Sequence, residues 1–498
     1  MKASRRLTLA LSTVLVLASC APGAANDADE DVANSGSGAP SGAGTGAGGG
    51  SSASSGSSSG GDPSFTCPAD AAAFDSFVQG LRADLQSKGV VGGAVAIVCG
   101  GDTVYAAGMG TTSAEGSPVT ATTRFQLASL TKTFTAVLGA RLAQRGALSL
   151  DDAASQWVPF VNTSAPYTSG FTFAQLLAHT AGYPTEVPGA DYSSLEGSFQ
   201  ANASVGLWSP PGAVFNYSND GYALAGLVAQ KAGGQSFASL VETEVFAPAG
   251  MTGARMNAQT VQSEGDYAVG HSSWTGETYH PTDGYLAAPY YGPMGGGWAS
   301  ATDLARFAQL LIKGGGDLLN AESMAALTTP RTPTSWGASR SYGLGLIVDD
   351  LDGAPVWSHS GSVAGFLSEL TVVPTRGFAI AILVNTDDYF PYVLEEAVSK
   401  FTGAPLPYPA IDDSFHAEDM DDHVGTYQSS ALGTVVVSKS GSQMQISYNG
   451  QTKSLSPAYR DTYSFEYDTW GPLDAFFWRE GGEVKYLVTL AGIGAKMP

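Results

Sequence analysis

The segment Ser129-Leu130-Thr131-Lys132 limits what this chain can fold into more than any other. It is the only S-x-x-K in 498 residues, and it opens a stretch whose apolar spacing predicts a helix from Ser129 to Arg145. Residues three apart on a helix share a face, so a hydroxyl and an amine lie side by side at the end where backbone N–H groups are unpaired. A serine nucleophile needs a base within hydrogen-bond reach, and a lysine serves only if its pKa is lowered. Alone, the pattern also fits a helix N-cap followed by a solvated lysine.

The N-terminal residues predict export. A positively charged start is followed by an apolar run from Leu7 to Leu17, which is too short to span a membrane. The run ends in Leu17-Ala18-Ser19-Cys20, which resembles a bacterial lipobox and implies a signal peptide over residues 1–19 and lipidation of Cys20. The alternative is a plain secretory signal with an incidental cysteine. We expect an extracytoplasmic protein anchored as a lipoprotein to a bacterial membrane.

Residues 20–66 predict a tether rather than a folded unit. They consist mainly of Gly, Ser and Ala, with almost nothing to bury. A flexible coil of this length has an r.m.s. reach of roughly 35–40 Å, enough to hold a folded body off a membrane surface.

Charge and cysteine usage exclude several classes of function. The formal net charge is −22 and falls by three when Lys2, Arg5 and Arg6 leave with the signal. Such a surface repels nucleic acid, which we do not expect as a partner. Cys67 and Cys99 remain as a pair in an exported protein and predict a disulfide. The sequence contains no C-x-x-C and no H-E-x-x-H, so neither a metal nor a cofactor is expected.

Apolar spacing predicts an α+β domain over residues 67–411. The order is a helix, a β-hairpin, a long and mostly helical middle, two strands at Phe366–Val373 and Phe378–Val384, and a last helix. The early strand Val90–Cys99 must pair with the late strands if their apolar faces are to be covered. The result is an antiparallel sheet flanked by helices, with an all-helical lobe.

The pattern of apolar and polar residues changes over residues 412–498. Short alternating runs are separated by turns, and Asn449-Gly450 and Gly481-Gly482 are strong hairpin signals. This part predicts a small all-β sheet or barrel of its own.

Three further motifs follow the S-x-x-K along the chain. They are Leu176-Leu177-Ala178-His179-Thr180-Ala181-Gly182, Phe215-Asn216-Tyr217-Ser218-Asn219 and Trp357-Ser358-His359-Ser360-Gly361. In this order and spacing, the chain resembles the serine β-lactamase and penicillin-binding protein superfamily. The nearest branch holds class C β-lactamases, D-alanyl-D-alanine carboxypeptidases and related serine esterases. The resemblance covers about residues 69–401 and implies a β-lactamase-like fold. Residues 412–498 more loosely resemble the lipocalin-like modules that follow some members.

The resemblance assigns roles to four side chains. Ser129 would be the nucleophile that forms an acyl-enzyme. Lys132 would take its proton or hold the proton network. Tyr217 matches the family's catalytic tyrosine, although a phenol with a pKa of about 10 is a poor base unless nearby cations stabilise the phenolate. Asn219 would hydrogen-bond the lysine and the substrate amide; the alternative is a helix cap.

His359-Ser360-Gly361 stands where β-lactamases have Lys-Thr-Gly. The resemblance implies an edge strand lining the cleft, with His359 and Gly361 binding substrate and the N–H groups of Ser129 and Ser362 forming the oxyanion hole. A histidine is largely neutral at pH 7, so we expect carboxylate binding that is weaker and more pH-dependent than with lysine. His179 is expected to be structural and to fix a turn.

These assignments predict a serine hydrolase that acts through an acyl-enzyme on an amide or ester. A D-alanyl cell-wall peptide is the first substrate class, and a small ester or weak class C β-lactamase activity is the alternative. The rival from another class is a non-catalytic penicillin- or muropeptide-binding sensor, which the filled catalytic positions disfavour. Because all four motifs precede residue 412, we expect the C-terminal domain to modulate access or stability and not chemistry.

Overall fold

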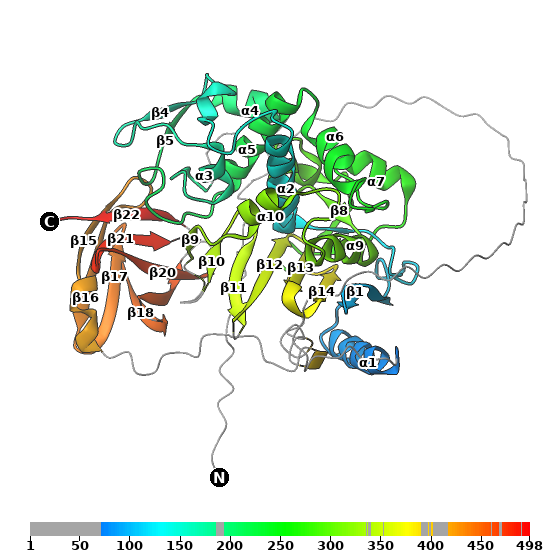
Figure 1. The fold of residues 1–498 in the computed structure, drawn as a ribbon. Coiled ribbons are helices and arrows are strands. Elements are labelled where there is room, and N and C mark those ends of the chain that lie inside the picture. Colours follow the sequence, from blue (N-terminus) through cyan, green and yellow to red (C-terminus); the bar gives the residue numbers. More distant parts are fainter. Residues whose placement is uncertain are drawn as a thin grey trace, which may run out of the picture.

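The structure is a computed structural model that shows two domains (Figure 1). It describes residues 71–185, 194–334, 336, 340–351, 353–389, 397, 400–401, 417–459, 461–467, 471–489 and 491–498. Cys20, Cys67, the signal and tether segments and the predicted domain boundary at 411/412 lie outside these residues. Within the described part of the chain, no helix is long and apolar enough to cross a membrane.

An eight-stranded antiparallel sheet forms the frame of the first domain, in the order β2-β1-β14-β13-β12-β11-β10-β9. Its strands are β1 (Gly92–Cys99), β2 (Thr103–Gly110), β9 (Thr332–Pro333), β10 (Ser341–Tyr342), β11 (Ile347–Leu351), β12 (Ala354–Val363), β13 (Phe366–Val373) and β14 (Phe378–Val384). The predicted pairing of early with late strands is confirmed, since Val95 of β1 lies opposite Ile382 of β14. Alternate side chains therefore enter the cores on the two faces of the sheet.

Helices cover both faces of this sheet, as Figure 1 shows. On one face, α1 (Ala71–Ser87) buries Phe74, Phe77 and Leu81 against β1 and β14. The larger core on the other face holds α9 and the helical lobe. The helices of that side are α2 (Thr131–Gln144), α3 (Phe173–Leu177), α4 (Leu195–Ala201), α5 (Asn219–Gly233), α6 (Phe237–Val241), α7 (Ala258–Glu264), α8 (Gly292–Gly295), α9 (Ala301–Ile312) and α10 (Ala321–Thr328).

Short elements connect the sheet and the lobe. Three two-stranded ribbons pair β3 (Phe125–Gln126) with β8 (Trp298–Ala299), β4 (Asn162–Ser164) with β5 (Ser204–Gly206), and β6 (Gly270–His271) with β7 (Thr278–Tyr279). The remaining short helices are the 3₁₀ helices η1 (Ala128–Leu130), η2 (Ala154–Gln156), η4 (Gly284–Ala287), η5 (Pro374–Arg376) and η6 (Ala417–His423), and the π-helix η3 (Glu242–Phe246). The ribbon of β3 and β8 leads into η1, which contacts α8.

Side-chain caps set where several helices begin. Thr172 forms a capping box at α3, and Ser300 forms another at α9. Ser218 caps α5 by accepting a hydrogen bond from the Gly221 N–H. The same helix ends at Gly234, whose φ of +68° suits a residue without a Cβ.

The second domain is a closed barrel of strands β15 to β22. They are β15 (Gly425–Ser429), β16 (Gly433–Ser440), β17 (Gln443–Tyr448), β18 (Gln451–Tyr459), β19 (Thr462–Tyr467), β20 (Gly471–Glu480), β21 (Glu483–Thr489) and β22 (Gly492–Lys496). The pairing of β15 with β22 closes the barrel, which leaves no sheet edge exposed. At the predicted hairpin turn, Asn449 and Gly450 both have positive φ, at 47° and 75°. The predicted all-β domain is confirmed.

Candidate active site

The turn that carries Ser129 is pinned against the sheet. Ser129 lies in η1, between the positive φ of +46° at Ala128 and the start of α2. The Leu127 carbonyl oxygen accepts a 2.7 Å hydrogen bond from the Ser368 hydroxyl of β13. A Cβ at Gly361 of β12 would lie 2.0 Å from that carbonyl oxygen, so only glycine allows this approach. The family-type Gly361 therefore holds the strand against the nucleophile turn.

Lys132 is fully buried and hydrogen-bonded to three oxygens. Its Nζ lies 3.0 Å from Ser129 Oγ, 2.8 Å from Asn219 Oδ1 and 2.9 Å from the Met294 carbonyl oxygen. Its ammonium position also lies 4.9 Å from the ring centroid of Tyr217. In the described residues no carboxylate pairs with it. The structure thus brings Ser129, Lys132, Tyr217 and Asn219 together from η1, α2 and α5.

Burial without a counter-ion determines the protonation state of Lys132. Desolvation lowers its pKa well below the ordinary value of a lysine. A neutral amine has two N–H donors and one lone pair. The oxygens of Asn219 and Met294 are acceptors only and take the two N–H bonds, so the lone pair faces the Ser129 hydroxyl. This arrangement fits a base that can remove the serine proton.

Tyr217 is positioned by the segment that leads into α5. Ser218 supplies the cap of that helix, which leaves the Asn219 side chain available for Lys132. The cap role considered for Asn219 is therefore wrong. His179 supports the segment from below: its Nδ1 accepts the Ser218 N–H at 2.9 Å, and its ring lies 4.3 Å from that of Tyr217. His179, which has a φ of +58°, contributes to the site by holding this segment in place.

The Tyr217 hydroxyl is hydrogen-bonded to Ser129 and is a neutral phenol. Burial raises its pKa above the ordinary value, and the hydrogen bond to Ser129 offsets this only in part. The phenol can therefore donate a proton but is a poor base at neutral pH. Of the two bases that the sequence left open, the electrostatics favour the Lys132 amine. Tyr217 is placed to pass a proton to a leaving group.

Comparison with known proteins identifies the family. The family model for Beta-lactamase matches residues 74–400, more than half of the chain. The chain belongs to the beta-lactamase family. It is a serine hydrolase of the beta-lactamase and penicillin-binding protein type.

Relatives of this family match over most of the chain. Penicillin-binding protein 4 of Amycolatopsis lactamdurans is 28% identical and aligns over 68% of this chain and 92% of its own. Penicillin-binding protein 4* of Bacillus subtilis (strain 168) is 27% identical, over 70% and 82%. The octameric penicillin-binding protein homologue from Pyrococcus abyssi has a TM-score of 0.59 at 23% identity, covering 85% of this chain and all of its own. At this identity, the similarity to the Pyrococcus abyssi protein shows a common fold alone.

The strand that carries His359-Ser360-Gly361 does not lie where the sequence predicted it. The strand β12 lies inside the sheet between β13 and β11, so the expected edge position is wrong. His359 is 3% exposed. Its Nε2 lies 2.9 Å from the Tyr342 hydroxyl and its Nδ1 lies 2.6 Å from the Ser360 carbonyl oxygen. Both ring nitrogens are occupied, and neither is presented to a carboxylate.

The charge of His359 follows from this burial. Desolvation, helped by the nearby Lys132, lowers its pKa to about 3, against a smaller opposite effect of the bond to Ser360. The ring is therefore neutral throughout the physiological range. The expectation of carboxylate binding that titrates near pH 6.5 rested on an exposed histidine, and this environment does not support it.

The remaining predicted residues lie close to the nucleophile or outside the described chain. Gly361 packs on the nucleophile turn, as described above, and Ser362 follows it on β12 with its hydroxyl buried and without a hydrogen-bond partner. Cys99 ends β1 and is buried, but Cys67 lies outside the described residues, so their disulfide stays a prediction. In the described residues no cluster of three or more His, Cys, Asp or Glu could hold a metal ion.

Sequence reasoning missed four residues that surround the site. The Met294 carbonyl binds Lys132, Tyr342 binds His359, and the indoles of Trp336 and Trp478 pack against the cluster that contains Tyr217. The unexplained Gly- and Pro-rich run at Gly292–Gly297 was an available signal for the first. The stretch Tyr342-Gly343-Leu344-Gly345-Leu346 supports the family resemblance but does not show that Tyr342 binds His359. Trp336 and Trp478 come from the β9–β10 connection and β20, and no local pattern marks them.

Proposed function

We propose that this chain hydrolyses an amide or ester through an acyl-enzyme on Ser129, with Lys132 as the base. The observation that carries the proposal is the buried Lys132 amine 3.0 Å from Ser129 Oγ, with its other two partners both acceptors. Attack of Oγ on the carbonyl carbon transfers the serine proton to Lys132. Tyr217 then donates its proton to the leaving group as the bond from the carbonyl carbon to that group breaks, and the protonated Lys132 returns a proton to Tyr217, so that both side chains are neutral again in the acyl-enzyme. Water completes the cycle by hydrolysing the ester of Ser129.

The N–H groups of Ser129 and Ser362 are proposed as the donors to the oxyanion. They belong to η1 and β12, which Gly361 brings into contact. Asn219, already bound to Lys132, is proposed to orient the substrate amide through its remaining N–H donors. His359 is proposed as a positioning residue, since Tyr342 and the Ser360 carbonyl hold both of its nitrogens.

A D-alanyl-D-alanine carboxypeptidase-like or penicillin-binding activity is the proposed substrate class. It is supported by the two relatives from Amycolatopsis lactamdurans and Bacillus subtilis, which are both penicillin-binding proteins. The second candidate is hydrolysis of neutral esters. It is favoured by the neutral His359, which offers no permanent cation to a carboxylate.

We also propose that the protein is exported and anchored outside a bacterial cytoplasmic membrane through Cys20. The supporting features are the short apolar run and the lipobox-like Leu17-Ala18-Ser19-Cys20. In a bacterial host, Cys20→Ala should move the protein from the membrane fraction to the soluble extracytoplasmic fraction. Equal membrane retention of both forms would show that Cys20 is not the anchor.

Covalent labelling tests the chemistry directly. The mature protein should be labelled by a fluorescent penicillin or a fluorophosphonate, and mass spectrometry should place the adduct on Ser129. Ser129→Ala should abolish labelling while keeping the melting temperature close to the parent's. Parallel assays with a D-Ala-D-Ala peptide, a chromogenic cephalosporin and a short-chain ester then select the substrate class. A folded parent that labels with neither probe and turns over none of the three would support the non-catalytic sensor.

A further inference from the structure

One residue of the barrel reaches the catalytic residues of the first domain. Trp478 of β20 packs against the buried cluster of Phe215, Tyr217 and Tyr342. The same indole also packs against Val214 and the barrel residues beside it, where the two domains meet. It is half-buried. The barrel therefore contributes an aromatic surface at the site.

A second indole comes from the first domain. Trp336, in the connection between β9 and β10, lies 5.5 Å from Tyr217 and 5.1 Å from Phe215 between ring centroids. It too is half-buried and packs on the same cluster as Trp478. Tyr217, which interacts with Ser129, therefore belongs to the same cluster on which both indoles pack.

The backbone is irregular directly after Trp478. The pairing of β20 with β21 shifts register between Trp478 and Arg479. Such bulges redirect side chains and are frequent next to active sites. The preceding residue, Phe477, lies inside the barrel, and its ring stacks on the ring of His423 with 4.4 Å between centroids. Alternation along β20 places Phe477 in the barrel core and Trp478 on the opposite side, where it contacts the first domain, and the bulge follows directly after Trp478.

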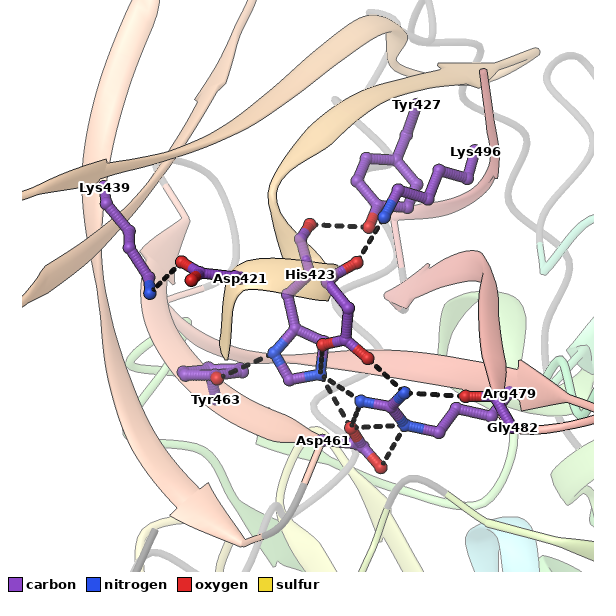
Figure 2. A network of polar contacts seen from close by, with 10 residues as sticks. Asp421, His423, Tyr427, Lys439, Asp461, Tyr463, Arg479, Gly482 and Lys496 are labelled. Carbon is purple, nitrogen blue, oxygen red and sulfur yellow. Dashed lines mark hydrogen bonds and ion pairs between the residues drawn. The ribbon is translucent and has the colours of Figure 1, made fainter. Parts of the chain in front are cut away.

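Arg479, the other residue of the bulge, is held by a network of charges (Figure 2). Its guanidinium donates to both oxygens of Asp461, with bonds of 2.7 to 3.0 Å, and forms an ion pair with Asp422. It also donates to the Gly482 carbonyl oxygen at 3.0 Å. Asp422 belongs to η6, Asp461 to the turn before β19, and Gly482 to the turn after β20. Three segments therefore fix the arginine and, through the bulge, its neighbour.

Figure 2 also shows how the network is anchored inside the barrel. His423 is fully buried, with its Nε2 2.6 Å from Asp461 Oδ1 and its Nδ1 3.0 Å from the Tyr463 hydroxyl. The Asp461 carbonyl oxygen accepts the Phe477 N–H at 2.7 Å. Each charged group has a partner of the opposite charge, so the network has one preferred geometry. Movement of Arg479 would break several bonds at once.

We propose that Trp478 is a specificity-determining residue of the hydrolase site and that Arg479 is its positioning residue. The inference rests on the proposed acylation of Ser129. The two indoles favour substrates with a bulky apolar or aromatic group beside the scissile bond over those with a small group. The barrel then takes part in substrate selection and does not only stabilise the protein.

The test compares ratios of kcat/KM within two matched pairs of esters. p-Nitrophenyl phenylacetate and p-nitrophenyl acetate differ in the acyl group, while 2-naphthyl acetate and phenyl acetate differ in the leaving group. Trp478→Ala should lower the bulky-to-small ratio of at least one pair roughly tenfold, the usual discrimination of an apolar surface. Trp478→Phe should restore most of it. A ratio within twofold of the parent's for both pairs in Trp478→Ala overturns the proposal.

A neighbour on the same strand provides the matched control. Phe476 packs against the domain contact at Val214 but not against the Tyr217 cluster. Phe476→Ala should keep both ratios within twofold of the parent's, even if it lowers the melting temperature. If Phe476→Ala and Trp478→Ala change the ratios equally, the effect comes from the domain contact, and the specificity role is rejected.

The positioning role of Arg479 has its own readout. Arg479→Lys keeps the charge but loses the bidentate geometry, so the same ratio should fall about threefold. In a Trp478→Ala background, Arg479→Lys should change the ratio no further, because it acts through the indole. An additional fall in the double variant would contradict this. Fluorophosphonate labelling of Ser129 in every protein separates the outcomes: an unlabelled parent refutes the hydrolase, and a labelled parent with unchanged ratios refutes only Trp478.

Discussion

The two polar networks near the domain contact are built in opposite ways. In the first domain, the amine of Lys132 is buried among neutral oxygens and aromatic rings, and no carboxylate of the described residues pairs with it. In the barrel, Arg479 is surrounded by Asp461 and Asp422. Hydrogen bonds that Arg479 donates to these carboxylates raise its pKa, whereas desolvation lowers the pKa of Lys132. Both side chains make several hydrogen bonds, so the number of hydrogen bonds does not distinguish the two networks.

The difference lies in whether charge is compensated. A buried charge with its partner removed costs several kcal/mol, and an uncompensated lysine avoids this cost by giving up its proton. The resulting neutral amine is reactive, while the compensated guanidinium is inert and rigid. A carboxylate next to a basic side chain is therefore the feature that distinguishes a structural network from a catalytic one in this chain.

Removing the base should give the largest effect. Lys132→Met fills similar volume without an amine, and kcat/KM should fall by about 10³-fold at pH 7, within the range of general-base catalysis. Lys132→Arg is the matched control for charge. Because a guanidinium keeps its proton up to a pKa above 12, this variant should be as inactive as Lys132→Met. Stopped-flow acylation by a penicillin measures both. Activity near the parent's in Lys132→Arg would show that a cation, and not a neutral amine, is required.

Adding a carboxylate should convert the catalytic network toward the barrel type. Asn219→Asp places a negative charge where Oδ1 now lies, 2.8 Å from Lys132 Nζ. An opposite charge stabilises the protonated lysine and raises its pKa by about 1–3 units. The base must be neutral to act, so the acid limb of the pH–rate profile should move to higher pH. Activity at pH 7 should fall about 10- to 100-fold and recover partly at pH 9.

Asn219→Ala separates charge from loss of a bond. It removes the acceptor without adding a carboxylate, so its acid limb should stay where the parent's is, even though the rate falls. The pH profile of kcat/KM measured from pH 5 to 10 distinguishes the two variants. If the limb moves equally in both, the charge argument for Lys132 fails.

The strands of the first domain were predictable where burial is continuous. The segments Phe366–Val373 and Phe378–Val384 are apolar runs bounded by turn residues, and both match the strands β13 and β14. The strands β11 and β22 were missed, because Ile347–Leu351 contains two aspartates and Gly492–Lys496 contains two glycines. These segments are extended because their backbone groups pair with neighbours, which a local pattern does not reveal.

The site was predictable only to the extent that it is local. The spacing of Ser129 and Lys132 on one helix face was readable from sequence, because helical geometry fixes it. The burial of His359 was not, since it depends on β11 and on Tyr342 covering the strand. The approach of Trp478 to Tyr217 joins residues from different domains. It depends on the relative placement of the domains, which the spacing of residues along the chain does not reveal.

The barrel network should respond to acid in a defined range. Burial by itself would raise the pKa of Asp461, but hydrogen bonds from His423 and Arg479 outweigh it and lower the pKa to about 2. A lowered folded-state pKa stabilises the protein above the unfolded value near 4, and this contribution is lost as pH falls toward 2. Asp461→Asn should therefore lower the free energy of unfolding by about 1–2 kcal/mol at pH 6, after allowance for solvent screening.

The same measurement at low pH sharpens the comparison. Urea unfolding of Asp461→Asn and the parent at pH 6 and pH 2.5 should give a difference that shrinks by more than half. Asp421→Asn is the control from the same region, because Asp421 pairs with Lys439 while largely exposed. Its effect should stay below about 0.5 kcal/mol at either pH. A difference for Asp461→Asn that is the same at both pH values would mean that this carboxylate is not held in its charged form.

His359 should show the smallest effect of all, although it is the only titratable side chain in the third motif. Its pKa of about 3 keeps the ring neutral from pH 5.5 to 8, so its charge does not change across that range. The ratio of KM for a D-Ala-D-Ala peptide to KM for a neutral ester should therefore be constant over these pH values. His359→Gln, which remains neutral and can still bond Tyr342, should give an equally flat ratio. If the parent's ratio instead rises as pH climbs through 6 to 7 and the variant's does not, His359 titrates near its ordinary 6.5 and binds the carboxylate. In that case burial does not set its charge, and the contrast between compensated and uncompensated networks would not extend to this residue.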